Sequence, residues 1–155
     1  MQFSTQQDIE APIETVFENL TCFELFERAA MRRGAEVRRK DSKTTFGVGT
    51  QWDVRFMLRG KERDVAVEIA TCVPSTDLVV ALLSDNIAGA VRCELFSLSK
   101  TRTRVAVVTE LTPKTLPARL IIQSLKLTKS TLNQKYKARI AEFAAEIEAR
   151  YRDTI

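Results

Sequence analysis

The sequence has 155 residues, of which 45% are hydrophobic and 28% are charged, and its formal net charge is +4. A chain of this size can bury a core without disulfide or metal staples. It contains no histidine, which excludes Ser-His-Asp and Cys-His catalysis, histidine-ligated metals and an imidazole pH switch. We expect a single domain over residues 1–155, with no metal and no other cofactor.

The N-terminal segment predicts a strand followed by two short helices. Residues 2–10 alternate between polar and apolar side chains, and Pro12 then fixes the backbone for a helix start. Residues 12–20 and 23–33 each place their apolar side chains on one helical face, and Gly34 is suited to end the second helix.

The middle of the chain changes to a period of two, which indicates strands. Clusters of turn residues separate these strands by short connections, so we expect an antiparallel meander. The predicted strands are a charged edge segment around Val37 and residues 51–58, 65–69, 78–84, 90–99 and 104–112.

After Pro113 the pattern returns to a helical period. Thr115 is placed to cap this helix, and Pro117 lies in its first turn. One apolar stripe then extends over about 30 residues, or about 45 Å, which predicts a single long helix lying across one face of the sheet. The stripe consists of Leu125, Leu132, Tyr136, Ile140, Phe143, Ile147 and Tyr151.

The segment Ile9-Glu-Ala11-Pro12-Ile-Glu14-Thr-Val16-Phe17 resembles the strand-to-helix entry of the helix-grip superfamily. This superfamily includes START lipid-transfer domains, the birch-pollen allergen and bacterial polyketide cyclase/dehydrase-like proteins, and the last of these branches is the most similar. Weaker matches are Gly47-Val-Gly49-Thr-Gln-Trp52 and Pro74 before Leu78. The resemblance covers essentially the whole element order. It implies an α+β helix-grip fold, in which a curved seven-stranded antiparallel sheet wraps around a long C-terminal helix, with two short helices between strands 1 and 2.

Such proteins hold an apolar cavity between the sheet and the helix. Packing predicts the same cavity, because a curved sheet and a straight helix leave a gap that few large side chains can fill here: aromatic residues make up only 7% of the chain. The candidate ligand-binding residues are the inward strand positions and the N-terminal part of the helix: Trp52, Val54, Phe56, Val67, Ile69, Val80, Leu82, Cys93, Leu95, Val107, Thr109, Leu120, Ser124, Leu125 and Thr128.

The sequence supports binding of a small hydrophobic molecule in this cavity, such as a lipid, an isoprenoid or an aromatic polyketide-like compound, for transport or sequestration. The alternative is a cyclase/dehydratase-like enzyme that uses carboxylate or tyrosine groups as acid and base. Nothing in the spacing pairs such groups, and we assign no catalytic residue. The ionisable candidates are Asp53, Glu68, Glu94, Glu110 and Tyr136.

The two alternatives differ in whether at least two ionisable side chains converge inside the cavity, and the orientation of Arg92, Glu94 and Glu110 bears on this question. The apolar alternation of their strands points all three to solvent. However, Phe96 and Leu98 share the face of Arg92 and Glu94, so the orientation of that strand stays open.

The charge is unevenly distributed. From Lys114 to Ala141 the chain carries seven bases and no acid, whereas residues 1–27 carry six acids and no base. The basic stretch could pair with the acidic segment, or contact an anionic membrane peripherally through Lys126, Lys129 and Lys137. Nucleic acid is not an expected partner, because the basic stretches lack interleaved aromatic residues.

The three cysteines, Cys22, Cys72 and Cys93, are widely spaced and odd in number. This pattern is typical of reduced, buried thiols. The first residues show no secretory signal, and the longest apolar run, Leu78–Leu83, is much shorter than a membrane span. We therefore expect a cytoplasmic protein.

Overall fold

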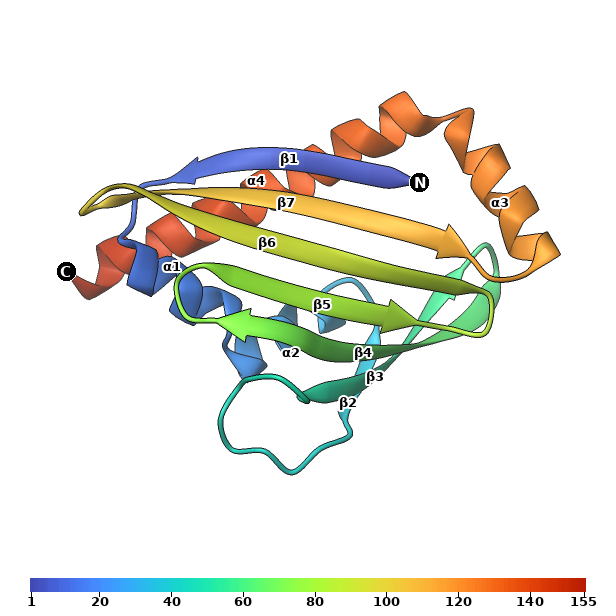
Figure 1. The fold of residues 1–155 in the computed structure, drawn as a ribbon, viewed down its shortest axis with the longest axis horizontal. Helices are drawn as coiled ribbons and strands as arrows, with labels where there is room; N and C mark the ends of the chain where they lie inside the picture. Colours follow the sequence, from blue (N-terminus) through green and yellow to red (C-terminus); the bar gives the residue numbers. More distant parts are fainter.

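The computed structural model describes all 155 residues. Seven strands form one antiparallel sheet in the order β1-β7-β6-β5-β4-β3-β2 (Figure 1). The meander runs from β2 to β7, and β1 closes it by pairing with β7. The strands are β1 (Gln2–Ile9), β2 (Glu36–Arg39), β3 (Gln51–Leu58), β4 (Lys61–Val73), β5 (Asp77–Leu83), β6 (Ile87–Ser99) and β7 (Arg102–Pro113).

Four helices complete the fold. Two short helices, α1 (Ile13–Leu20) and α2 (Phe23–Met31), lie between β1 and β2 as the sequence predicts. Two more, α3 (Leu116–Lys126) and α4 (Lys129–Thr154), follow β7, and α4 packs mainly against β1. None of these helices is both long enough and apolar enough to cross a membrane.

The predicted long C-terminal helix is confirmed as α4, which has 26 residues. The prediction that it runs unbroken from Thr115 is wrong, because the chain bends at Leu127 and Thr128. The amides of these two residues donate to the carbonyls of Ser124 and Leu125, three residues back, so the last turn of α3 tightens. Thr128 then leaves the helical region with φ −112° and ψ 21°. As a result, α3 turns away from α4 and runs along one end of the sheet (Figure 1).

The opposite end of the sheet is filled by aromatic side chains. Trp52 is fully buried on β3, and its ring stacks on Phe26 of α2 at 4.2 Å between centroids. Its Nε1–H donates to the Glu27 carboxylate at 3.0 Å, and Phe23 and Phe46 pack around it. This end of the inner face is therefore solid core.

The entry motif identified in the sequence has a packing role. Ile9, Ala11 and Val16 are all buried, and the Ala11 amide donates to the Ile9 carbonyl at 2.9 Å where the chain bends between β1 and α1. The hydroxyl of Thr103, which is also buried, donates to the Ala11 carbonyl at 2.8 Å. This bond satisfies a backbone oxygen that the bend would otherwise leave buried without a partner.

Candidate functional site

A pocket of about 750 Å³ lies between the inner face of the sheet and α3. Its size falls within the usual range for sites that take small molecules. It lies at the end of the sheet away from Trp52, where the inner face is covered by α3 and not by α1 and α2. Its apolar lining is Phe56, Leu58, Val65, Leu82, Ile87, Leu111, Pro117, Ala118 and Ile121.

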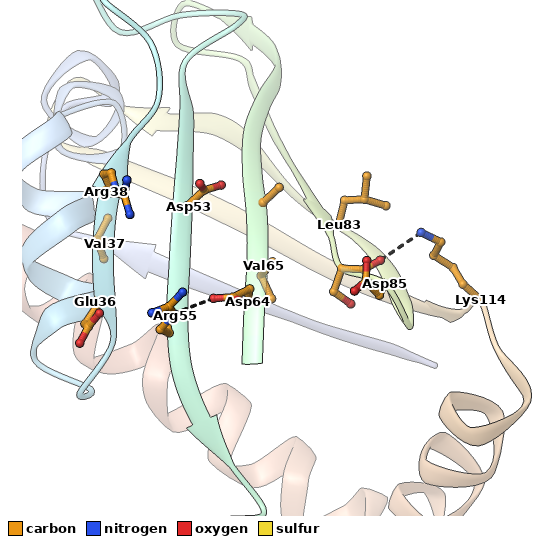
Figure 2. A pocket seen from close by; sticks show the side chains of 12 residues that line it. Glu36, Val37, Arg38, Asp53, Arg55, Asp64, Val65, Leu83, Asp85 and Lys114 are labelled. Atoms are coloured by element: carbon orange, nitrogen blue, oxygen red, sulfur yellow. Dashed lines mark hydrogen bonds and ion pairs between the residues drawn. The ribbon is translucent and has the colours of Figure 1, made fainter. Parts of the chain in front are cut away.

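A split in the sheet opens onto this pocket. The pairing between β4 and β5 stops at Ala66 and Leu83, although β4 continues to Lys61 paired with β3 alone. A second, polar pocket lies along the same split and shares Asp64, Val65, Ser84 and Asp85 with the first. Figure 2 shows this polar pocket, with β2, β3 and β4 on one side and Lys114 on the other.

Of the charged groups that line the polar pocket, Arg55 and Asp64 pair with each other, and Asp53 pairs with Lys40. Arg55 pairs with Asp64 at 2.9 Å and with Glu62 at 3.1 Å, and the Lys114 ammonium donates to the Ser84 carbonyl at 3.0 Å. These contacts hold the carboxylates of Glu62 and Asp64 toward Arg55, on the outer side of the sheet.

Gly89 contributes space to the apolar pocket. A Cβ atom at this position would lie 2.9 Å from Leu111 Cδ2 and 3.0 Å from the Glu110 carbonyl oxygen. Both distances are shorter than an ordinary contact, and the second involves backbone that cannot easily move. Glycine therefore lets β6 and β7 approach closely beneath the pocket without adding a side chain to it.

Arg63 is one of six charged residues that line this pocket, together with Arg59, Lys61, Glu62, Asp64 and Asp85. It lies on β4 two residues before Val65, so it shares the inward face of Val65, Val67 and Ile69, and it is paired in register with Phe56. Its Nε–H is buried without a hydrogen-bond acceptor in the protein. The carboxylates of its sequence neighbours Glu62 and Asp64 pair with Arg55, and Arg63 itself makes no ion pair.

The sequence pattern did not identify Arg63, because the predicted strand begins at Val65. The signal was present: extending the alternation of Val65, Val67 and Ile69 back by two residues reaches Arg63. The pattern that identifies such a residue is a charged side chain at a strand position where the alternation predicts an inward, apolar one.

No family model matches the sequence, and no curated protein matches it either. Solved structures, in contrast, match nearly its full length. The Zhui aromatase/cyclase from Streptomyces sp. R1128 has a TM-score of 0.68 at 14% identity, over 97% of this chain and 94% of that one. A START superfamily protein from Mycobacterium smegmatis has a TM-score of 0.61 at 16% identity, over 99% of both chains. For Ara h 8.0201 the TM-score is 0.64 at 14% identity, over 99% of this chain and 98% of that one. The chain has the helix-grip fold.

Within this helix-grip fold, the predicted ligand-binding residues separate into four groups. Phe56 and Leu82 line the pocket. Val54, Thr109 and Leu125 are half-buried outside its lining. A third group is buried in the core: Trp52, Val67, Ile69, Val80, Cys93, Leu95 and Val107.

The fourth group, Leu120, Ser124 and Thr128, is exposed. The expectation that these three face the sheet is wrong, because it followed from an unbroken helix. The bend after Lys126 lets α3 bury a different face, centred on Ala118 and Ile122.

The acid and base candidates do not converge in the pocket of this helix-grip protein. Asp53, Glu68 and Glu110 are exposed on the outer side of their strands, and Asp53 pairs there with Lys40 at 3.3 Å. Glu94 lies on the same outer side of β6 as the exposed Arg92, Phe96 and Leu98. The orientation left open by the sequence is therefore outward.

Tyr136 has a structural partner. Its hydroxyl and that of Thr109 are hydrogen-bonded at 3.0 Å, and burial raises the pKa of Tyr136 above its ordinary value. The phenol therefore stays protonated near neutral pH.

The three thiols should differ in reactivity. Cys93 is buried, and burial raises its pKa to about 11, whereas Cys22 and Cys72 are half-buried. In the folded protein at about pH 8, iodoacetamide should label Cys22 and Cys72 well before Cys93, because the thiolate is the nucleophile. Mass spectrometry of digested protein measures this order, and labelling in urea should remove it. Equal labelling of Cys93 and Cys22 in the folded state would contradict the burial of Cys93.

Burial of this thiol also makes stability depend on pH. The pKa of Cys93 is higher in the folded state than the value of about 8.5 for a free thiol, so the folded state retains the proton longer. The contribution of the protonated Cys93 thiol to the free energy of unfolding is therefore complete below the free-thiol pKa, and it declines as pH rises toward the folded pKa.

Proposed function

We propose that the protein binds a small, mainly apolar molecule that carries an anionic oxygen group, in the pocket between α3, the β3–β4 hairpin and the inner face of the sheet. The observation that carries the proposal is Arg63, whose Nε–H is buried in this pocket without an acceptor. A carboxylate, phosphate or ionised phenol would accept from the guanidinium, in a geometry for which arginine is well suited. The apolar lining would hold the rest of the ligand.

Lipids, isoprenoids and aromatic polyketide-like compounds all offer such an apolar body. The structural neighbours named as an aromatase/cyclase and a START superfamily protein support the binding of a hydrophobic ligand in general. Holding the ligand for transport or sequestration needs no catalytic group. A cyclase or dehydratase reaction has less support, because the candidate acids lie on the outer side of the sheet. The free cysteines favour a cytoplasmic location.

Two fluorescent probes with the same ring system test this proposal. Anilinonaphthalene sulfonate carries an anionic group, and phenylnaphthylamine lacks it. We expect the sulfonate to bind the folded protein about tenfold more tightly, because only it can pair with Arg63. Equal affinities would contradict the proposed role of the anionic group, and binding of neither probe would contradict the pocket as a ligand site.

Filling the pocket should weaken the binding of both probes. Leu82 lines the pocket opposite Gly89 in the pairing of β5 with β6, so Leu82→Trp should weaken both probes by about tenfold or more through lost volume. Leu83→Trp is the matched control, because Leu83 is exposed on the outer side of the same strand and should change neither affinity. Near-UV circular dichroism checks that both variants stay folded, since loosely packed states also bind the sulfonate.

A further inference from the structure

The outward face of α3 carries a stripe of exposed leucines. Leu116, Leu120 and Leu127 are 68%, 59% and 88% exposed. At 100° per residue, Leu116 and Leu120 project within about 40° of each other, and Leu127 follows directly after the last residue of α3. The fold does not use this stripe, since α3 is held to the sheet by its other face, where Ala118 and Ile122 are buried.

Positive charge accompanies the stripe without compensation. Arg119 and Lys126 lie beside the leucines on α3, and Lys129 begins α4. None of these three makes an ion pair; of the seven bases between Lys114 and Ala141, only Arg139 makes one, with Glu142.

The expectation that this stretch pairs with the acidic N-terminal segment is not met. Asp8 pairs with Arg102 and Arg104 instead, and Glu10 pairs with Arg102. The cations around α3 are thus free for a partner outside the chain.

We propose that α3 docks this protein onto an anionic lipid bilayer. The three leucines would enter the interface, while Arg119, Lys126 and Lys129 contact lipid headgroups. A convex, narrow apolar stripe with bases along one side is the pattern of an interfacial amphipathic helix. The remaining exposed bases of α4, Lys135 and Lys137, extend the positive surface beyond this helix.

Docking through α3 would also place the pocket beside the membrane, and this step rests on the proposed function. Pro117, Ala118 and Ile121 of the same helix line the pocket. Across the pocket, the β3–β4 hairpin adds the exposed apolar Leu58 together with Arg59 and Lys61. A hydrophobic ligand could then pass between bilayer and pocket with little exposure to water.

Co-sedimentation with vesicles tests the docking. The wild-type protein should bind phosphatidylcholine vesicles containing phosphatidylglycerol about tenfold better than pure phosphatidylcholine vesicles, and salt should weaken this binding. The combined variant Leu116→Ser, Leu120→Ser, Leu127→Ser should lose about tenfold or more. The double variant Arg119→Glu, Lys126→Glu should lose the dependence on phosphatidylglycerol.

Leu83→Ser combined with Leu98→Ser is the matched control, since both leucines are exposed on the outer side of the sheet, at 52% and 42%. This variant should bind vesicles as the wild type does. Failure of the wild-type protein to bind anionic vesicles would overturn the docking, as would equal binding by the leucine-to-serine variant of α3. A dimer in gel filtration that this variant dissociates, without vesicle binding, would assign the stripe to a second copy of the chain and also overturn it.

The probe assay separates this proposal from the proposed function. In solution, the α3 leucine-to-serine variant should bind anilinonaphthalene sulfonate as the wild type does, because the three leucines lie outside the pocket lining. Normal probe binding with no wild-type vesicle binding would overturn the docking alone. Vesicle binding by a protein that takes up neither probe would support the docking and overturn the proposed function.

Discussion

Replacing Arg63 with methionine should weaken the binding of anilinonaphthalene sulfonate by about tenfold to a hundredfold while leaving the affinity for phenylnaphthylamine nearly unchanged. A hydrogen bond to a charged group contributes about 1.5–3 kcal/mol, which corresponds to this loss. Methionine retains a flexible apolar side chain of comparable length, so the pocket keeps its shape. The variant therefore removes the charge and the donors rather than the volume.

The same substitution should raise the free energy of unfolding, by about 1 kcal/mol. The reason is that the Nε–H of Arg63 is buried without an acceptor, so the folded state loses an unfavourable group. Weaker binding together with higher stability is the sign of a residue placed for a ligand at a cost to the fold. Urea denaturation measures the stability, and fluorescence titration measures the affinities.

Two further variants sharpen this experiment. Arg63→Lys keeps the charge but loses the planar fork, so its affinity for the sulfonate should fall between those of the wild type and the methionine variant. Arg92→Met removes an exposed arginine on the outer side of β6, and it should change neither affinity nor stability. If Arg63→Met lowers stability and leaves both affinities unchanged, Arg63 has a structural role only.

The sheet could be predicted from the sequence because alternation and turn residues agree along most of its strands. The observed strand Gln51–Leu58 has the predicted bounds. The Thr115 cap is also confirmed, since its hydroxyl accepts from the Ala118 amide at 3.3 Å. Such features depend on residues close together in the chain, and local patterns therefore report them well.

The bend between α3 and α4 could not be read from the apolar stripe. The step of seven from Leu125 to Leu132 keeps the helical phase whether or not the helix is continuous. No proline or glycine marks Leu127 or Thr128. The direction that α3 takes depends on packing against the distant end of the sheet, and local periodicity does not report it.

The candidate site was the least predictable part, because alternation identifies the face of a strand and not the cover above it. Trp52 and Phe56 share one face of β3, yet Trp52 is fully buried and Phe56 lines the pocket. The difference comes from Phe26 and Glu27, which α2 places over Trp52; Glu27 lies 25 residues before Trp52 in the chain. Long-range packing of this kind decides which inward residues a ligand can reach.

Replacing Trp52 with alanine should therefore cost stability and not binding specificity. Trp52 is fully buried and packs on Phe26, Phe23 and Phe46. Truncating a large buried aromatic side chain lowers the free energy of unfolding by about 3–5 kcal/mol, through lost burial and the cavity that remains. This loss is a large part of the total stability of a domain, which is about 5–15 kcal/mol.

If the alanine variant does not fold, the milder variant Trp52→Phe tests whether Trp52 serves the stability of the fold or the binding of a ligand. It retains most of the apolar contact but removes the Nε1–H that donates to Glu27 at 3.0 Å, so it should cost about 1–3 kcal/mol by leaving a half-buried carboxylate without its donor. Its affinities for the two naphthalene probes should match those of the wild type, because Trp52 lies outside the pocket lining.

The control variant is Met57→Ala, at an exposed position of the same strand, which should change the free energy of unfolding by less than about 0.5 kcal/mol. A Trp52→Phe variant with wild-type stability and weakened probe binding would instead place Trp52 in the ligand site, as the sequence pattern alone suggests.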